Sequence, residues 1–156
     1  MKTGIIYYSK TGHTKEVCER IYREIDADLL PIEARSDSPD QDTVELIDPP
    51  KIEGYDRLVI ASPVHGFSLA RIMRAYLKGI SDFKGVTIDL FVTQFFPFSR
   101  LGAKQALQQM KRMVEQRRGI VSSQTAISWS KGREKSITGF VDRIHGSNAS
   151  TDGKRI

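Results

Sequence analysis

Hydrophobic positions along the chain alternate between two patterns. Short runs rich in β-branched and other apolar residues occur at Lys2–Tyr8, Asp28–Ile32, Arg57–Ala61, Val86–Thr93 and Ile120–Ser128. Elsewhere, apolar residues recur three and four positions apart, at Val17–Ile25, Leu69–Ile80, Gly102–Arg118 and Ile137–Ile144. The first pattern predicts β-strands, and the second predicts amphipathic helices.

Two segments lack either pattern. The stretch 35–55 contains three prolines, a glycine and several aspartates, so we expect mostly loop there and no long helix. From residue 146 the chain is rich in Gly, Ser, Asn, Thr and Asp. We therefore expect one domain, residues 1–145, followed by a flexible polar tail, residues 146–156.

Five strands alternating with helices predict an α/β fold. It would be a three-layer sandwich in which helices cover both faces of a five-stranded parallel sheet. Right-handed crossovers leave few arrangements for 156 residues, and the strand order 2-1-3-4-5 fits best. In such sheets a ligand binds beyond the carboxyl ends of the strands, where the strand order reverses. The loops after the first, third and fourth strands should therefore hold the binding residues.

The first of these loops is rich in hydroxyl groups. It consists of Ser9, Lys10, Thr11, Gly12, His13 and Thr14. Three hydroxyls, a glycine that lets the backbone approach a ligand, and the free N–H groups of a helix N-terminus suit a phosphate group. The alternative is ordinary helix capping by Thr11 or Thr14. The chain has neither the P-loop spacing nor a Gly-x-Gly-x-x-Gly motif, so neither of those nucleotide-binding sites is expected.

The segment Tyr7–Thr14 resembles the phosphate-binding loop of flavodoxins, Thr/Ser-x-Thr-Gly-x-Thr. The resemblance returns at Tyr55–Val64, which is similar to the third strand and second flavin loop of flavodoxin-like proteins. It implies a flavodoxin-like domain that binds FMN, with the first loop holding the phosphate. It also implies flavin contacts from a second loop, made by Ser62, Pro63, Val64, His65 and Gly66. His65 and Phe67 are flat enough to stack on a flavin, although the family often has Trp or Tyr nearby.

The third loop follows the fourth predicted strand. By the resemblance, its ring contacts would be Thr93, Gln94, Phe95 and Phe96. The first two suit the pyrimidine edge of a flavin, and a phenylalanine suits the face of its ring. The loop lacks the glycine and the acid that are usual in electron-carrier flavodoxins. Its phenylalanines would equally suit a core, a lid or a subunit contact.

Charge is distributed unevenly along the chain. Residues 1–99 hold 12 basic and 15 acidic side chains, whereas residues 100–156 hold 12 and 4. Electron-carrier flavodoxins are typically acidic, so the basic second half argues against the partners of an ordinary shuttle. We nevertheless expect the partner to be a redox protein or a small-molecule electron acceptor, and we disfavour nucleic acid.

The expected function is FMN-dependent electron transfer or flavin redox chemistry. Two alternatives stay open: an enzyme resembling NAD(P)H:quinone reductases or protoporphyrinogen oxidases of this fold, and a cofactor-free binding module. The sequence shows no catalytic acid–base constellation and no metal-ligand cluster, and it leaves a homodimer open. Cys18 is the single cysteine, so no internal disulfide forms, and its helical position predicts a core-facing thiol. No apolar run is long enough to span a membrane and no signal peptide is evident, so we expect a cytoplasmic protein.

Overall fold

The computed structural model describes residues 2–35, 43–94, 100–129 and 132–153. Two of the predicted ring contacts, Phe95 and Phe96, lie outside the described residues. The strands are β1 (Thr3–Tyr7), β2 (Asp28–Pro31), β3 (Glu33–Ala34), β4 (Leu46–Ile47), β5 (Arg57–His65), β6 (Ser68–Leu69), β7 (Thr87–Gln94) and β8 (Ile120–Ser128). The helices are α1 (His13–Tyr22), α2 (Arg71–Gly79), α3 (Arg100–Gln116) and α4 (Arg133–Gly153).

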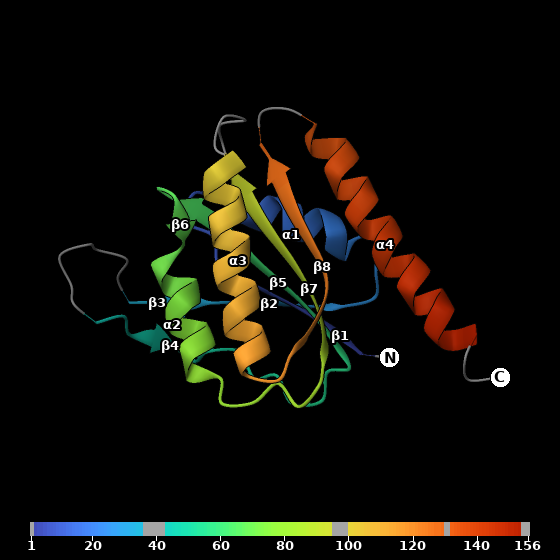
Figure 1. Cartoon of the computed structure of the whole chain (residues 1–156), viewed down its shortest axis with the longest axis horizontal. Coiled ribbons are helices and arrows are strands. Elements are labelled where there is room, and N and C mark those ends of the chain that lie inside the picture. Colours follow the sequence, from blue (N-terminus) through green and yellow to red (C-terminus); the bar gives the residue numbers. More distant parts are fainter. Residues whose placement is uncertain (1, 36–42, 95–99, 130–131, 154–156) are drawn as a thin grey trace.

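The main sheet has five parallel strands in the order β2-β1-β5-β7-β8. This order confirms the predicted 2-1-3-4-5 arrangement, because β1, β2, β5, β7 and β8 are the five predicted strands. Helices α2 and α3 cover one face of the sheet, and α1 and α4 cover the other, which gives three layers (Figure 1). The carboxyl ends of the strands meet at the upper edge of the molecule in Figure 1.

Alternation along the central strands produces two separate cores. Ile60 and Leu90 pack beneath α2 and α3, whereas their neighbours Val59 and Phe91 pack beneath α1 and α4. All four side chains are fully buried. Because successive residues of a strand point to opposite faces, a sheet covered on both sides needs nearly continuous apolar strands, as the sequence has.

The second predicted loop is shorter than expected. Strand β5 continues through Ser62 to His65 and turns back as β6, which pairs with it in antiparallel register. The proline in this segment made a strand hard to predict. Strand β1 pairs with β5 only as far as Ala61, so at Pro63 the pairing continues only with β7, and a residue without an N–H is tolerated there.

Two further segments are more regular than the sequence predicted. The 35–55 region follows β3 directly and contains β4, and these two short strands form a small antiparallel pair. The predicted loss of regular structure at residue 146 does not occur, because α4 continues to Gly153. Extending an existing helix gains one hydrogen bond per residue, and Ser or Asn lowers the helix propensity by only about 0.7 kcal/mol relative to Ala.

A buried ion pair joins the sheet to α4. Arg57 Nε donates to Asp89 Oδ2 at 2.7 Å, and both side chains are almost fully buried. Ser123 Oγ donates to Asp89 Oδ1 at 2.6 Å, and Arg57 Nη1 donates to the carbonyl of Ile144 at 3.5 Å. Within the described part of the chain, no helix has the length and apolar character needed to cross a membrane, and no three metal-ligating side chains cluster.

Candidate functional site

The carboxyl end of the sheet contains a cavity of about 280 Å³. Its lining residues are Lys10, Thr11, His13, Thr14, Pro63, Val64, His65, Thr93, Gln94 and Trp129. They come from the loop after β1 with the start of α1, from the ends of β5 and β7, and from the residue after β8. The structure thus brings together residues from all three predicted loops at one place.

A larger cavity of about 600 Å³ lies near the opposite end of the sheet. It is lined by the segment 48–53 together with Leu46 and the end of α2, and it receives no residue from the three loops. The Tyr76 hydroxyl beside it donates to the carbonyl of Pro50 at 2.7 Å. Burial raises the pKa of Tyr76, so this phenol stays protonated. The 280 Å³ cavity is the better candidate site because it gathers more polar donors around it.

The first loop is shaped by Gly12 and held by Ser9. Gly12 precedes α1 with a φ of 94°, a left-handed conformation that favours glycine. Ser9 Oγ accepts hydrogen bonds from the N–H groups of Gly12 and Lys15, at 3.2 and 3.1 Å. These bonds use both lone pairs of the hydroxyl, which keeps its own proton for donation. The helix start is thus capped by a side chain, but the residue differs from the predicted alternative. Ser9, and not Thr11 or Thr14, accepts the hydrogen bonds from the backbone N–H groups there.

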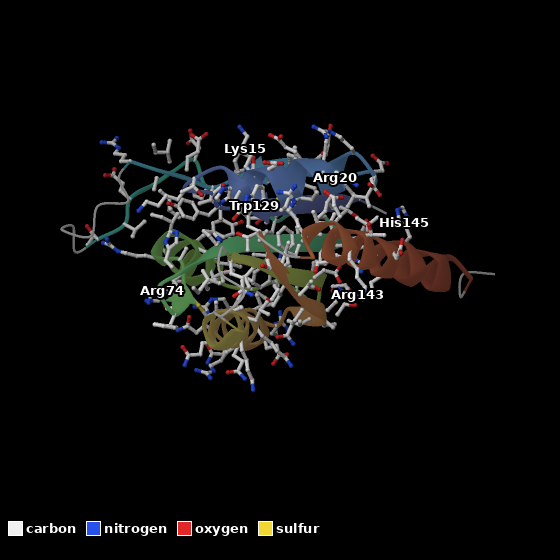
Figure 2. The ribbon with its side chains drawn as sticks, turned by 90° about the horizontal axis from the view of Figure 1, so that it is seen from above. Lys15, Arg20, Arg74, Trp129, Arg143 and His145 are labelled. Carbon is white, nitrogen blue, oxygen red and sulfur yellow. The ribbon has the colours of Figure 1, made fainter. Side chains whose placement is uncertain are left out.

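A stack of side chains flanks this loop. The His13 ring lies on the indole of Trp129, with centroids 4.2 Å apart and planes inclined by 26°. Thr11 Oγ1 lies 3.3 Å from His13 Nδ1, and the Arg133 guanidinium lies 4.4 Å from the centre of the Trp129 ring. Figure 2 looks onto the carboxyl end of the sheet and shows Trp129 near its centre, between α1 and the sheet.

The sequence prediction missed Trp129 as a cavity residue. It follows β8 directly, so it lies at the same edge of the sheet as the three loops, and this position was the available signal. Cys18, in contrast, faces the core as predicted, and burial raises the pKa of its thiol well above the ordinary value.

A buried hydrogen bond joins the first and third loops. Thr14 Oγ1 and Thr93 Oγ1 are 2.7 Å apart, and both residues are almost completely buried. One hydroxyl proton lies between the two oxygens, so the accepting hydroxyl keeps its own proton for another acceptor. This bond connects the start of α1 directly to the end of β7 in the lining of the cavity.

The remaining predicted residues lie at the second and third loops. The ring of His65 meets Tyr8 edge-on at 6.2 Å. Ser62 is fully buried, its hydroxyl donates to the carbonyl of Pro63 at 3.0 Å, and Gly66 occupies the turn into β6 with a φ of 62°. Neither Ser62 nor Gly66 lines the cavity. Gln94 Oε1 is buried and has no hydrogen-bond partner among the described residues.

A family model described as a flavodoxin domain matches residues 4–117. This chain belongs to the flavodoxin domain family. The match spans β1 to the end of α3 and therefore includes all three loops, while Trp129 lies beyond it. No curated protein matches the sequence.

Several solved structures have the same fold as this chain and match most of its length. A WrbA-like flavodoxin from Agrobacterium tumefaciens has a TM-score of 0.71 at 14% identity, covering 99% of this chain and 98% of its own. A Fusobacterium nucleatum flavodoxin bound to flavin mononucleotide has a TM-score of 0.67 at 16% identity, with coverages of 94% and 98%. A Lactobacillus acidophilus flavoprotein in complex with FMN has a TM-score of 0.64 at 21% identity, with coverages of 86% and 97%. At these identities the likeness shows the fold.

Proposed function

We propose that this protein binds FMN in the 280 Å³ cavity and uses it to transfer electrons. The observation that carries the proposal is the convergence of the three loops on that single cavity at the point where the strand order reverses. Family membership and the FMN complexes among the structural relatives support the same choice of cofactor.

The first loop has the donor set that a phosphate monoester requires. Ser9 and Thr11 offer hydroxyl groups, and the first turn of α1 presents N–H groups that have no partner within the helix. Lys10 adds a cation, and the positive end of the α1 dipole favours an anion. These neutral and cationic donors suit a dianion, and no carboxylate lines the described part of the cavity to oppose it.

The rest of the cavity suits a planar ring with polar edges. Pro63, Val64 and His65 form one side, and Thr93 and Gln94 form another. The amide oxygen of Gln94 is buried and has no partner among the described residues. Because the two ends of an amide are assigned from their surroundings, this side chain can present either an acceptor or a donor to a ring edge. Bound there, FMN would supply reversible one- and two-electron chemistry, while the protein supplies binding, orientation and electrostatics.

Comparing FMN with riboflavin tests the phosphate assignment. The flavin-free protein would be titrated with each compound while the fluorescence of Trp129, the single tryptophan, is recorded. We expect FMN to bind at least tenfold more tightly, because riboflavin lacks the phosphate that the first loop would hold. A protein that binds neither compound would overturn the proposed function.

Variants then locate the phosphate. Removing a hydrogen bond to a charged group costs about 1.5–3 kcal/mol, so Thr11→Ala should weaken FMN binding about 10- to 100-fold and leave riboflavin binding nearly unchanged. Thr138→Ala, at an exposed position of α4, is the matched control and should change neither affinity. An equal loss for FMN and riboflavin in Thr11→Ala would place the phosphate elsewhere.

Electron transfer itself needs a separate measurement. We expect the FMN-loaded protein to exchange electrons with a redox protein and to show no sustained oxidation of NADH or NADPH in the presence of a quinone. Sustained turnover would show an enzyme instead of a carrier, without affecting the assignment of the FMN site.

A further inference from the structure

The His13 side chain is in contact with two other residues of the candidate site. Its ring lies on the indole of Trp129, with centroids 4.2 Å apart, and its Nδ1 lies 3.3 Å from Thr11 Oγ1. All three residues line the candidate FMN cavity. The backbone N–H of Trp129 donates to the carbonyl of Gln94 at 2.7 Å, which ties Trp129 to the end of β7. His13 therefore connects a tied aromatic ring to a hydroxyl group that the proposed function assigns to the phosphate.

The protonation of His13 decides where the hydroxyl proton of Thr11 points. In one neutral tautomer Nδ1 carries no proton, so it accepts the Thr11 proton, which is then not available to a ligand. In the other neutral tautomer and in the imidazolium, Nδ1–H donates to Thr11 Oγ1, and the hydroxyl keeps its proton for a phosphate oxygen. The imidazolium always has this second arrangement, whereas the neutral ring has it only in one of its two tautomers.

The charged surroundings of His13 come from the two cavities that Trp129 lines. One is the candidate FMN cavity, and the other, of about 310 Å³, is lined by α1 and the start of α4. The titratable and charged groups described there are Lys10 and His65 in the first cavity and Glu16, Arg20, Arg23, Arg133 and Glu134 in the second. Four of them are cations and two are carboxylates, so a phosphate dianion would offset the excess of positive charge. The face of an indole also attracts a cation. A proton on His13 is therefore best accommodated when the phosphate is bound.

We propose that His13, held by Trp129, directs the hydroxyl proton of Thr11 toward the FMN phosphate, and that the protonated form of His13 does so most effectively. His13 and Trp129 are then positioning residues, because Thr11 is the one that contacts the ligand. The inference rests on the proposed function, since it requires the phosphate to lie in the first loop. Imidazole ordinarily titrates near pH 6.5, so the FMN affinity that depends on His13 should fall as the pH rises through this region.

A ratio of two affinities isolates this effect from the ionisation of the ligand. A phosphate monoester loses its second proton near pH 6, which changes FMN binding to any site that prefers the dianion. His13→Asn keeps a polar group near the position of Nδ1 but does not titrate. Both proteins would be titrated with FMN from about pH 5.5 to about pH 8, with flavin fluorescence as the signal. Dividing the wild-type affinity by the His13→Asn affinity cancels the contribution of the ligand.

We expect this ratio for FMN to fall about fivefold as the pH rises over that range. The fall is smaller than the loss of a whole hydrogen bond, because one neutral tautomer still leaves the Thr11 proton to the phosphate. The same ratio for riboflavin, which has no phosphate, should stay constant. A constant ratio for FMN, in a protein that still prefers FMN to riboflavin, would overturn the inference and leave the proposed function intact.

His145→Asn is the matched control. It removes an imidazole from α4, where His145 Nε2 lies 3.1 Å from the carbonyl of Glu24, beyond the end of α1. Figure 2 shows His145 well apart from Trp129. This variant should keep the wild-type dependence of FMN affinity on pH. A loss of that dependence in His145→Asn would assign the titration to the wrong histidine and overturn the inference.

Thr11→Ala distinguishes action through Thr11 from direct action of the imidazolium on the phosphate. When His13→Asn is added to Thr11→Ala, the ratio of the two FMN affinities should vary with pH by less than about twofold, because no hydroxyl proton is left to direct. A full fivefold variation would show that the charge of His13 acts on the phosphate by itself, and the positioning role would be wrong.

Two variants of Trp129 test the stack, with the same ratio as the measurement. Trp129→Phe retains an aromatic face and should retain the dependence on pH, whereas Trp129→Leu is apolar without that face and should reduce it to less than about twofold. An unchanged dependence in Trp129→Leu would contradict the role of the indole. A protein that binds neither FMN nor riboflavin at any of these pH values would overturn the proposed function and this inference together.

Discussion

The two ends of the sheet differ in whether their buried polar groups have hydrogen-bond partners. Toward the amino end, Arg57, Asp89 and Ser123 satisfy one another inside the protein. Toward the carboxyl end, Gln94 Oε1 and Arg74 Nε are buried without partners among the described residues. Buried polar atoms without partners are rare in native proteins, because each costs about 1–3 kcal/mol. The contrast indicates that the amino end is built for stability and the carboxyl end for binding.

Breaking the buried ion pair should give the largest effect. Arg57→Ala leaves the carboxylate of Asp89 buried beside Ser123 without a cation, which typically costs about 3–5 kcal/mol. The lower free energy of unfolding should appear as a lower urea midpoint with an unchanged slope. The FMN affinity of the folded fraction should not change, because the pair lies far along the strands from the cavity.

The double variant Arg57→Leu with Asp89→Leu is the control for this prediction. Replacing both charges by apolar groups removes the uncompensated carboxylate, so the double variant should be more stable than Arg57→Ala. Wild-type stability in Arg57→Ala, or a loss of FMN affinity in the double variant, would contradict the division between the two ends.

Substitutions at two glycines test the same difference between the amino and carboxyl ends of the sheet. A Cβ at Gly119, before β8, would lie 2.5 Å from Val114 Cγ1 and 2.8 Å from Ile88 Cδ1. Gly119→Ala should therefore cost about 1–3 kcal/mol through overpacking, without weakening FMN binding. Thermal unfolding and FMN titration measure the two effects.

Gly12→Ala is the counterpart at the carboxyl end. A Cβ there would meet nothing within 4 Å, but the φ of 94° is unfavourable for alanine, so we expect a cost of about 1–2 kcal/mol. In this variant the FMN affinity should fall as well, because a relaxed φ would move the first loop. If Gly119→Ala weakened FMN binding and Gly12→Ala did not, the proposed location of the phosphate would be wrong.

The sequence predicted the five strands because each has an apolar pattern of its own, and right-handed crossovers then left few possible strand orders. It predicted the cavity residues Thr11, His13 and Thr93 because strand ends in such a fold point to one edge. It could not predict the Thr14–Thr93 bond, which joins residues 79 positions apart. It also missed the β5–β6 hairpin, because the loss of β1 as a neighbour at Pro63 is a tertiary feature that local propensity does not contain.

The Thr14–Thr93 bond gives a smaller prediction. Thr93→Val keeps the shape of the side chain but leaves the Thr14 hydroxyl buried without its partner, at a cost of about 1 kcal/mol. FMN binding should weaken at the same time, because this bond ties the first loop to the third. Thr93→Ser retains the hydroxyl, so this variant should bind FMN with wild-type affinity. Its free energy of unfolding should remain somewhat below that of the wild type, because the buried methyl group is lost. A stable Thr93→Val protein with wild-type affinity would show that the two loops are held independently.

The smallest effect is expected from the exposed Asp82–Arg118 pair at the amino end. Arg118 donates to both carboxylate oxygens, and the Lys84 N–H donates to Oδ1 at 2.8 Å. These donors lower the pKa of Asp82 below its ordinary value of 3.8. Because the folded-state pKa is lowered, the pair stabilises the protein above about pH 4, and this contribution is lost as the pH falls through the lowered pKa.

Asp82→Asn should therefore lower the thermal midpoint slightly at pH 7, and the difference from wild type should shrink as the pH approaches 2. Because the pair is exposed, 0.5 M salt should reduce the difference at pH 7. FMN affinity at pH 7 should match wild type, because the carboxyl end contains its own donors and shares none with this pair. A change in that affinity would mean that charges at the amino end act on the cofactor cavity, and the two ends would then be coupled instead of separate.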